Sequence, residues 1–142
     1  MRLCNETDER SEMSIDGKKA YSGFAVPDLE AAQRFYGETL GVKVSKPAEN
    51  APLLELGLGD QSTLIYEKPD HEPANFTILN FPVADVDAAV DELAEKGIEF
   101  ERYPGFDQDE KGIANPPEPG MGPRIAWFKD PAGNILSVHE DA

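Results

Sequence analysis

Several residue types that particular functions require are scarce in this sequence. One cysteine, Cys4, is present, so no disulfide can form within the chain. Two histidines, His71 and His139, are the imidazoles available to a metal or catalytic site. No stretch approaches the roughly 18 consecutive apolar residues of a membrane-spanning helix, and the charged first residues lack the apolar run of a signal peptide. These absences predict a cytoplasmic protein without a membrane span.

Positive charge is scarce as well. The 142 residues include 13 lysines and arginines against 28 aspartates and glutamates, which gives a formal net charge of −15 at pH 7. Such a field repels nucleic acid and anionic membranes, so neither is expected as a partner. The same field favours a cationic ligand, although solubility alone is a sufficient explanation of the charge.

The chain contains an internal sequence repeat. The segment 26–32 (VPDLEAA) returns as 83–89 (VADVDAA), 57 residues later. A helical stretch follows each copy, and each stretch ends at a glycine, Gly41 or Gly97. The repeat predicts a pseudo-twofold body with a cleft between its halves, and the function is expected in that cleft.

The length is that of a single domain. Residues 1–19 show no hydrophobic period and are expected to be a disordered leader. The remaining residues, 20–140, are expected to form one domain of two modules, 20–68 and 76–140, joined by a proline-bounded linker at 69–75.

Both modules are predicted to run strand–helix–strand–strand–strand, which is an α+β fold. Asp28 and Asp85 are expected to cap helices over 29–40 and 86–96. Alternation and turn residues predict strands at 20–26, 42–45, 53–58 and 62–67 in the first module, and at 76–83, 98–103, 124–128 and 135–140 in the second. A long loop, 105–122, remains without regular structure.

Certain residues of this pattern resemble the vicinal oxygen chelate superfamily, which contains glyoxalases, bleomycin-resistance proteins and extradiol dioxygenases. The matching segments are Val-Pro-Asp-Leu at 26–29 leading to Phe-Tyr at 35–36 and Leu-Gly-Val at 40–42, and Phe-Lys-Asp-Pro-Ala-Gly-Asn at 128–134. The resemblance implies two βαβββ modules that form a cup-shaped pair of sheets, with helices on the outside.

Alternation along the strands assigns the side chains to the two faces of such sheets. Phe24, Val26, Leu79, Phe81, Val83, Leu136 and Val138 are expected to face the helices. The cup face would then carry Tyr21, Gly23, Ala25, Leu64, Tyr66, Phe76, Ile78, Asn80, Pro82, Ile135, Ser137 and His139.

The resemblance also implies four positions for metal ligands in the metal-using members. These positions hold Tyr21, Leu64, Ile78 and Ser137 here, none of which is a usual ligand. No metal and no cofactor are therefore expected. A site on His139 with Glu67 or Glu140 is conceivable, but both acids fall on the opposite strand phase.

Eight residues are expected to contact a ligand in the cup: Tyr21, Leu64, Tyr66, Ile78, Asn80, Trp127, Ser137 and His139. Tyr21 and Trp127 could equally belong to the core or to a dimer interface. His139 could be a general base or a solvated rim residue, and at strand spacing it lies too far from Ser137 for a nucleophilic pair. His71 is expected at the surface of the linker.

Three functions stay open. The first is a metal-independent small-molecule binder, with a cationic or aromatic ligand. The second is a lyase or dioxygenase-type enzyme with an atypical metal site, and the third is a non-catalytic regulatory domain. A homodimer is expected because the two modules leave sheet edges to cover. Loop 105–122 is either a lid over the cup or an insertion on its rim.

Overall fold

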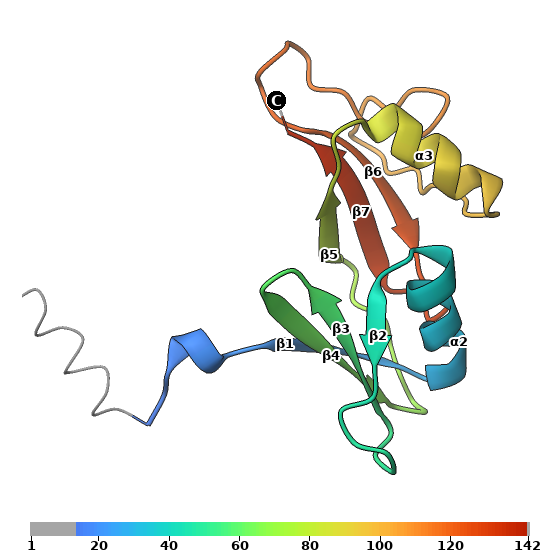
Figure 1. Cartoon of the computed structure of the whole chain (residues 1–142). Helices are drawn as coiled ribbons and strands as arrows, with labels where there is room; N and C mark the ends of the chain where they lie inside the picture. The colour runs from blue at the N-terminus through green and yellow to red at the C-terminus, as the bar shows by residue number, and fades with distance from the viewer. Residues whose placement is uncertain (1–13, 142) are drawn as a thin grey trace, which may run out of the picture.

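The computed structural model describes residues 14–141, and these residues form two halves that follow each other along the chain (Figure 1). Residues 1–13 of the expected leader lie outside the described residues. Its last residues form a short 3-10 helix, η1 (Gly17–Lys19), in which the Asp16 side chain accepts a hydrogen bond from the Lys18 backbone N–H at 3.0 Å. None of the described helices is long and apolar enough to cross a membrane.

The first half is a four-stranded sheet in the order β1-β4-β3-β2. Its strands are β1 (Ser22–Val26), β2 (Lys43–Ser45), β3 (Leu53–Leu58) and β4 (Gln61–Glu67). The β1 and β4 strands run parallel, and the other pairs are antiparallel. All four expected strands of this half are therefore confirmed.

The helix of the first half changes type along its length. The α-helix α2 (Leu29–Gln33) begins at Asp28, whose carboxylate accepts a hydrogen bond from the Ala31 N–H at 3.2 Å. A π-helix, η2 (Arg34–Thr39), then follows. A continuous α-helix over 29–40 was therefore the wrong expectation. The wider π turn accommodates an extra residue, because Asp28 and Gly41 are one position further apart than Asp85 and Gly97.

The second half has the strand order β5-β7-β6. Its elements are β5 (Thr77–Pro82), α3 (Val86–Glu95), β6 (Arg124–Lys129) and β7 (Ile135–Glu140). The α3 helix begins at Asp85, whose carboxylate accepts a hydrogen bond from the Ala88 N–H at 3.1 Å. The repeated aspartate therefore caps both helices, as the sequence predicted.

The strand expected at 98–103 is reduced to a single bridge, between Phe100 and Phe128. Beyond that bridge, backbone groups of the segment form hydrogen bonds with a side chain instead of with a neighbouring strand. The Gln108 amide accepts from the Tyr103 N–H and donates to the Glu101 carbonyl, both at 2.8 Å. A regular strand was therefore the wrong expectation here, because its hydrogen-bonding groups are occupied locally.

One hydrophobic core serves both halves. The helices lie on the same side of the molecule, and the residues beneath them come from both sheets (Figure 1). Fully buried members include Tyr36, Leu54, Leu56, Ile65, Val86, Phe128 and Leu136. All seven residues that alternation assigned to the helix side belong to this core or pack against it, so their assignment is confirmed. Ile78, assigned to the cup face, also packs against this core, at an irregularity in the register of β5. The opposite side of each sheet is called the inner face below.

Candidate functional site

A buried carboxylate in the turn between β6 and β7 joins the two halves. Asp130 is 5% exposed and accepts a hydrogen bond from the Tyr36 hydroxyl at 2.7 Å. It also accepts from the backbone N–H groups of Ala132 and Asn134, both at 2.9 Å. Burial, and then the nearby Asp130 charge, raise the pKa of Tyr36 above its ordinary value. The tyrosine is therefore held protonated as a donor.

Asn134, in the same turn, is 2% exposed and connects this network to the linker. Its amide nitrogen donates to the Ala25 carbonyl at 3.1 Å and to the Asp130 carboxylate at 3.0 Å. Both of these partners only accept, so the orientation of the amide is fixed and its oxygen must accept. That oxygen lies 3.1 Å from Nε2 of His71. His71 therefore donates from Nε2, and it is half-buried, in contrast to the surface position that the sequence suggested.

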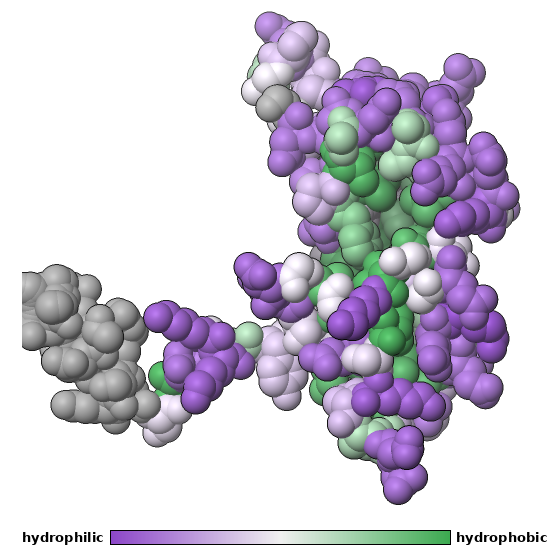
Figure 2. Space-filling model, viewed as in Figure 1, coloured by the Kyte–Doolittle hydropathy of each residue, from purple (hydrophilic) through white to green (hydrophobic). Residues whose placement is uncertain are grey.

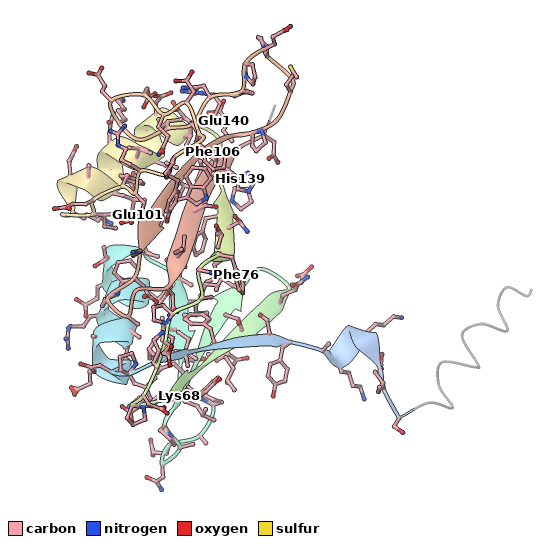
Figure 3. All side chains as sticks on the ribbon, turned by 180° about the vertical axis from the view of Figure 1, so that it is seen from behind. Lys68, Phe76, Glu101, Phe106, His139 and Glu140 are labelled. Atoms are coloured by element: carbon pink, nitrogen blue, oxygen red, sulfur yellow. The ribbon has the colours of Figure 1, made fainter. Side chains whose placement is uncertain are left out.

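A pocket of about 540 Å³ opens beside this histidine, where the linker passes between the halves. The first sheet contributes Gly23, Phe24, Ala25 and Tyr66, and the second half contributes Thr77, Ile78 and Asn134. The segment 68–76 between β4 and β5, which contains the linker, contributes Lys68, Asp70, His71, Glu72, Ala74 and Phe76. Figure 3 shows Lys68 and Phe76 at two points along this passage. The pocket therefore brings together two of the predicted ligand-binding residues, Tyr66 and Ile78.

The side chains of Tyr66 and Phe76 leave aromatic surface open at this pocket. Tyr66 is 41% exposed and Phe76 is 65% exposed. Gly23 and Ala25, which also line the pocket, have small side chains. An apolar molecule could therefore be covered by aromatic rings here while a polar group on it reaches the linker.

Other predicted ligand-binding residues lie on the inner face of the second sheet. The Ser137 hydroxyl is fully buried and donates to the Asn80 side-chain oxygen at 2.6 Å. Trp127 is 8% exposed and packs against Tyr103 and Phe106, with ring centroids 5.4 and 4.9 Å apart. Trp127 therefore belongs to a small buried cluster within one chain.

His139 follows Ser137 by two residues on β7 and lies near Phe106 in Figure 3, whereas the predicted residues of the first half lie apart from that cluster. Nδ1 of His139 is 2.9 Å from the Asp141 carboxylate, and the imidazole makes no pair with Ser137. Leu64 lies beside Gly23 on the first sheet, and Tyr21 is 67% exposed just before β1. Figure 3 shows His139 in the same half as Phe106 and away from Lys68. The eight predicted residues are thus divided between the two halves of one chain.

The donor set at the four family positions does not fit a metal. Leucine and isoleucine have no donor atom, and the Ser137 hydroxyl is already bonded to Asn80. The alternative around His139 is not assembled either, because Glu140 accepts from the Val86 N–H at 2.9 Å on the helix side. Within residues 14–141, no group of three or more histidines, cysteines or acids is placed to hold a metal ion.

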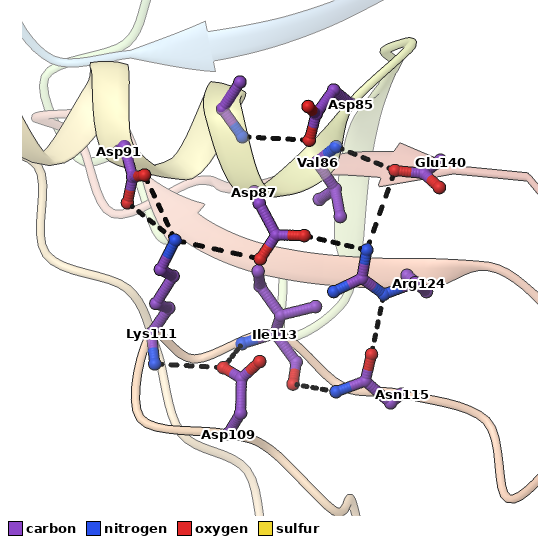
Figure 4. Close-up of polar contacts among 11 residues, drawn as sticks. Asp85, Val86, Asp87, Asp91, Asp109, Lys111, Ile113, Asn115, Arg124 and Glu140 are labelled. Atoms are coloured by element: carbon purple, nitrogen blue, oxygen red, sulfur yellow. Dashed lines mark hydrogen bonds and ion pairs between the residues drawn. The ribbon is translucent and has the colours of Figure 1, made fainter.

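The first part of loop 105–122 is bound to the body by its own polar groups. The Arg102 guanidinium donates to the carbonyls of Asp109 and Glu110 at 2.6 and 2.8 Å. The Asp109 carboxylate accepts from the N–H of Ile113 at 3.0 Å, and the Ile113 side chain is completely buried. Lys111 Nζ lies 3.0 Å from Asp91 of α3 (Figure 4). These contacts argue against a lid that moves as one piece.

A second ion pair fastens the same loop region to the start of α3. Arg124 lies 2.9 Å from the Asp87 carboxylate and donates from Nε to the Asn115 side chain at 2.7 Å (Figure 4). The hydrogen bond from Arg124 lowers the pKa of Asp87 below its ordinary value. The exposed part of the loop is its tip, where Met121 and the prolines line a second hollow of about 510 Å³ with Phe106.

The chain is similar in sequence and fold to proteins of one family. A model of the Glyoxalase/Bleomycin resistance protein/Dioxygenase superfamily matches residues 20–138. The chain belongs to this superfamily. The match covers both halves and both copies of the repeat, so the resemblance seen in the sequence is confirmed. No curated protein matches the chain.

Solved structures of this superfamily show the same fold over most of the chain. A glyoxalase family protein from Bacillus anthracis superposes with a TM-score of 0.65 at 23% identity, covering 90% of this chain and 99% of that one. TnmS3, an antibiotic binding protein from Streptomyces sp. CB03234, gives 0.62 at 25% identity over 92% and 100%. FosX, a fosfomycin resistance protein from Listeria monocytogenes, gives 0.66 at 15% identity over 90% and 95%.

The sequence offered no direct signal for the linker side of the pocket. His71 stands between Asp70 and Glu72 in a segment bounded by Pro69 and Pro73, which is a composition typical of an exposed connection. The pairing of His71 with Asn134 joins residues 63 positions apart, and no local pattern encodes such a distance.

Proposed function

We propose that the chain is a metal-independent small-molecule-binding protein of the superfamily, and that its ligand occupies the pocket at the linker. The supporting observation is a pocket of about 540 Å³ with open aromatic surface, next to family metal positions that carry no ligand set. TnmS3, with 25% identity over the whole of its length, is an antibiotic binding protein, which favours binding over catalysis for this chain.

The proposed ligand is aromatic or cationic. Tyr66 and Phe76 supply ring faces for stacking and for cation–π contact. The acids of the linker, Asp70 and Glu72, and the net charge of −15 favour a positive or neutral molecule over an anion. A ligand held between the rings and the linker would have much of its apolar surface buried away from water.

We further propose that two copies pair. Large apolar side chains remain in solvent, among them Tyr66, Phe76, Phe106 and Met121. A second chain related by a twofold axis would cover these residues and would place the linker pocket next to the other copy. Light scattering on the eluting protein should give twice the mass of one chain, and a monomer at micromolar concentration would contradict the pairing.

The first experiment is elemental analysis of the purified, tag-free protein, followed by calorimetric titration of Ni²⁺, Zn²⁺, Mn²⁺ and Fe²⁺. We expect no stoichiometric metal and no saturable binding. One tightly bound metal per chain would overturn the proposal and make the enzyme alternative the leading one.

The second experiment locates the ligand. A panel of aromatic amines is titrated into the wild type and into Tyr66→Ala and Phe76→Ala, which remove the two exposed rings of the pocket. Phe106→Ala is the matched control, because it removes a ring of similar exposure, 55%, outside the pocket. We expect binding to weaken about tenfold in the two pocket variants only, since a buried aromatic contact contributes about 1–2 kcal/mol.

A further inference from the structure

The pocket at the linker contains a histidine whose tautomer is set by buried neighbours. Asn134 can offer only its oxygen to His71, because its nitrogen donates to the Ala25 carbonyl and the Asp130 carboxylate. His71 therefore carries a proton on Nε2. Its other ring nitrogen, Nδ1, has no hydrogen-bond partner among residues 14–141. In the neutral imidazole that nitrogen is an acceptor.

The backbone around His71 is fixed, so the imidazole is positioned in advance. The Lys68 N–H donates to the Val26 carbonyl at 2.8 Å, and the His71 N–H donates to the Lys68 carbonyl at 3.0 Å. Two residues after the histidine, Pro73 packs against the turn, where a Cβ added to Gly133 would come within 3.2 Å of the proline ring. A held acceptor costs a ligand less entropy than a mobile one.

The charges around the pocket select against anions. Lys68, the cation in the lining, is paired with Asp70 at 2.7 Å. Glu72 adds a second carboxylate to the lining. An anionic ligand would meet these carboxylates without a free cation, whereas an N–H donor would meet an imidazole acceptor and aromatic rings.

We propose that Nδ1 of His71 is the polar recognition atom of this pocket, and that the pocket takes neutral or cationic aromatic molecules that carry an N–H donor. The ring of the ligand packs on Tyr66 and Phe76, and its N–H donates to the imidazole. This inference rests on the binding function proposed above and assigns the group that selects the ligand.

The tautomer can be tested without any ligand. Two-bond ¹⁵N–¹H correlation spectra of the wild type at pH 8 should show His71 with its proton on Nε2 and an unprotonated Nδ1. The Asn134→Ala variant removes the acceptor that fixes this form, so a mixture of tautomers is expected there. A proton on Nδ1 of the wild-type residue would overturn the inference, whatever the protein binds.

The ligand class is tested with three probes of similar shape: indole, 1-methylindole and indole-3-acetate. For the wild type we expect indole to bind about fivefold to tenfold more tightly than 1-methylindole, which lacks the donor, and indole-3-acetate to bind most weakly. His71→Phe should weaken indole by the same factor and leave 1-methylindole unchanged. His139→Phe is the control, because His139 lies outside the pocket lining.

The two proposals fail in different ways. Indole and 1-methylindole binding equally, with affinity lost in Tyr66→Ala but kept in His71→Phe, would overturn the role of His71 and leave the binding function standing. Tighter binding of indole-3-acetate would overturn the selection against anions. Failure of all three probes to shift the resonances of the pocket residues would overturn the inference and the location of the site together.

Discussion

The two halves of the chain share one plan, yet their inner faces are covered differently. In the first half that face carries Gly23, Ala25 and the open ring of Tyr66. In the second half Trp127 is 8% exposed beneath Tyr103 and Phe106, which come from the segment after α3. The long connection of the second half thus fills its own sheet with side chains. The pocket of about 540 Å³ lies at the linker, beside the sheet that lacks such a connection, whereas the hollow of about 510 Å³ in the second half lies along loop 105–122.

The helices differ in a related way. The first copy has one more residue between Asp28 and Gly41 than the second has between Asp85 and Gly97. The π turn of η2 accommodates this extra residue. Within this turn Tyr36 is fully buried and donates to Asp130 of the second half. A single inserted residue therefore accompanies a buried polar link between the halves. Apolar residues also gather in the hollow between the halves (Figure 2).

The largest effect is expected when that link is broken. Asp130→Ala removes the acceptor of the Tyr36 hydroxyl and of the turn N–H groups, which are then buried without partners. We expect about 4 kcal/mol to be lost from the free energy of unfolding, measured in urea. Asp85→Ala, which removes only an exposed helix cap, should cost about 1 kcal/mol. Equal losses would mean that the halves are held together by apolar packing alone.

A smaller but substantial effect is expected from the loop that covers the second half. Ile113→Ala removes a fully buried side chain from the shared core and should cost about 3 kcal/mol. Met121→Ala, in the same loop at 63% exposure, should change stability by less than about 0.5 kcal/mol. A neutral Ile113 variant would restore the possibility that the whole loop moves as a lid.

The buried Tyr36 of the first half should make the free energy of unfolding depend on pH in the alkaline range. Its pKa is raised in the folded protein, so the unfolded chain loses this proton first, near the ordinary tyrosine pKa of about 10. Stability from Tyr36 is complete below that pH and falls by about 1.4 kcal/mol per pH unit above it. Tyr36→Phe should cost about 2 kcal/mol at pH 7 and remove this part of the alkaline slope. Tyr21→Phe, which removes the same hydroxyl at a 67% exposed site, is the matched control.

The smallest effect concerns the ion pairs of α3. Asp87 has its pKa lowered by the hydrogen bond from Arg124, so its contribution exists above the ordinary aspartate pKa and is lost as the pH falls through the lowered one. Asp87→Asn should cost less than about 1 kcal/mol at neutral pH, and less still in high salt, because the carboxylate is 43% exposed. Glu30→Gln is the matched control at the same place in the repeat. If the free energy of unfolding of the two variants depends on acidic pH in the same way, the Asp87–Arg124 ion pair contributes nothing to stability.

Prediction from the sequence succeeded where a signal is local or periodic. The repeat, both helix caps, the strands other than 98–103 and the assignment of faces follow from alternation and turn residues, which act within a few positions. The candidate site residues stay a prediction. Tyr66 and Ile78 line the pocket, but the pairing of Ser137 with Asn80 and the burial of Trp127 depend on neighbours brought by other strands.

The residues alone were enough to identify the family and the two-module plan, because these depend on residue type and spacing. Only the folded chain shows that the inner faces of the two halves are covered differently and that His71 is part of a pocket. That outcome needed Asn134, Asp130 and Ala25 to meet, and their contacts span up to 109 positions. Hydrogen bonds between residues so far apart in the sequence form only when the core has assembled, so no local sequence pattern could predict them.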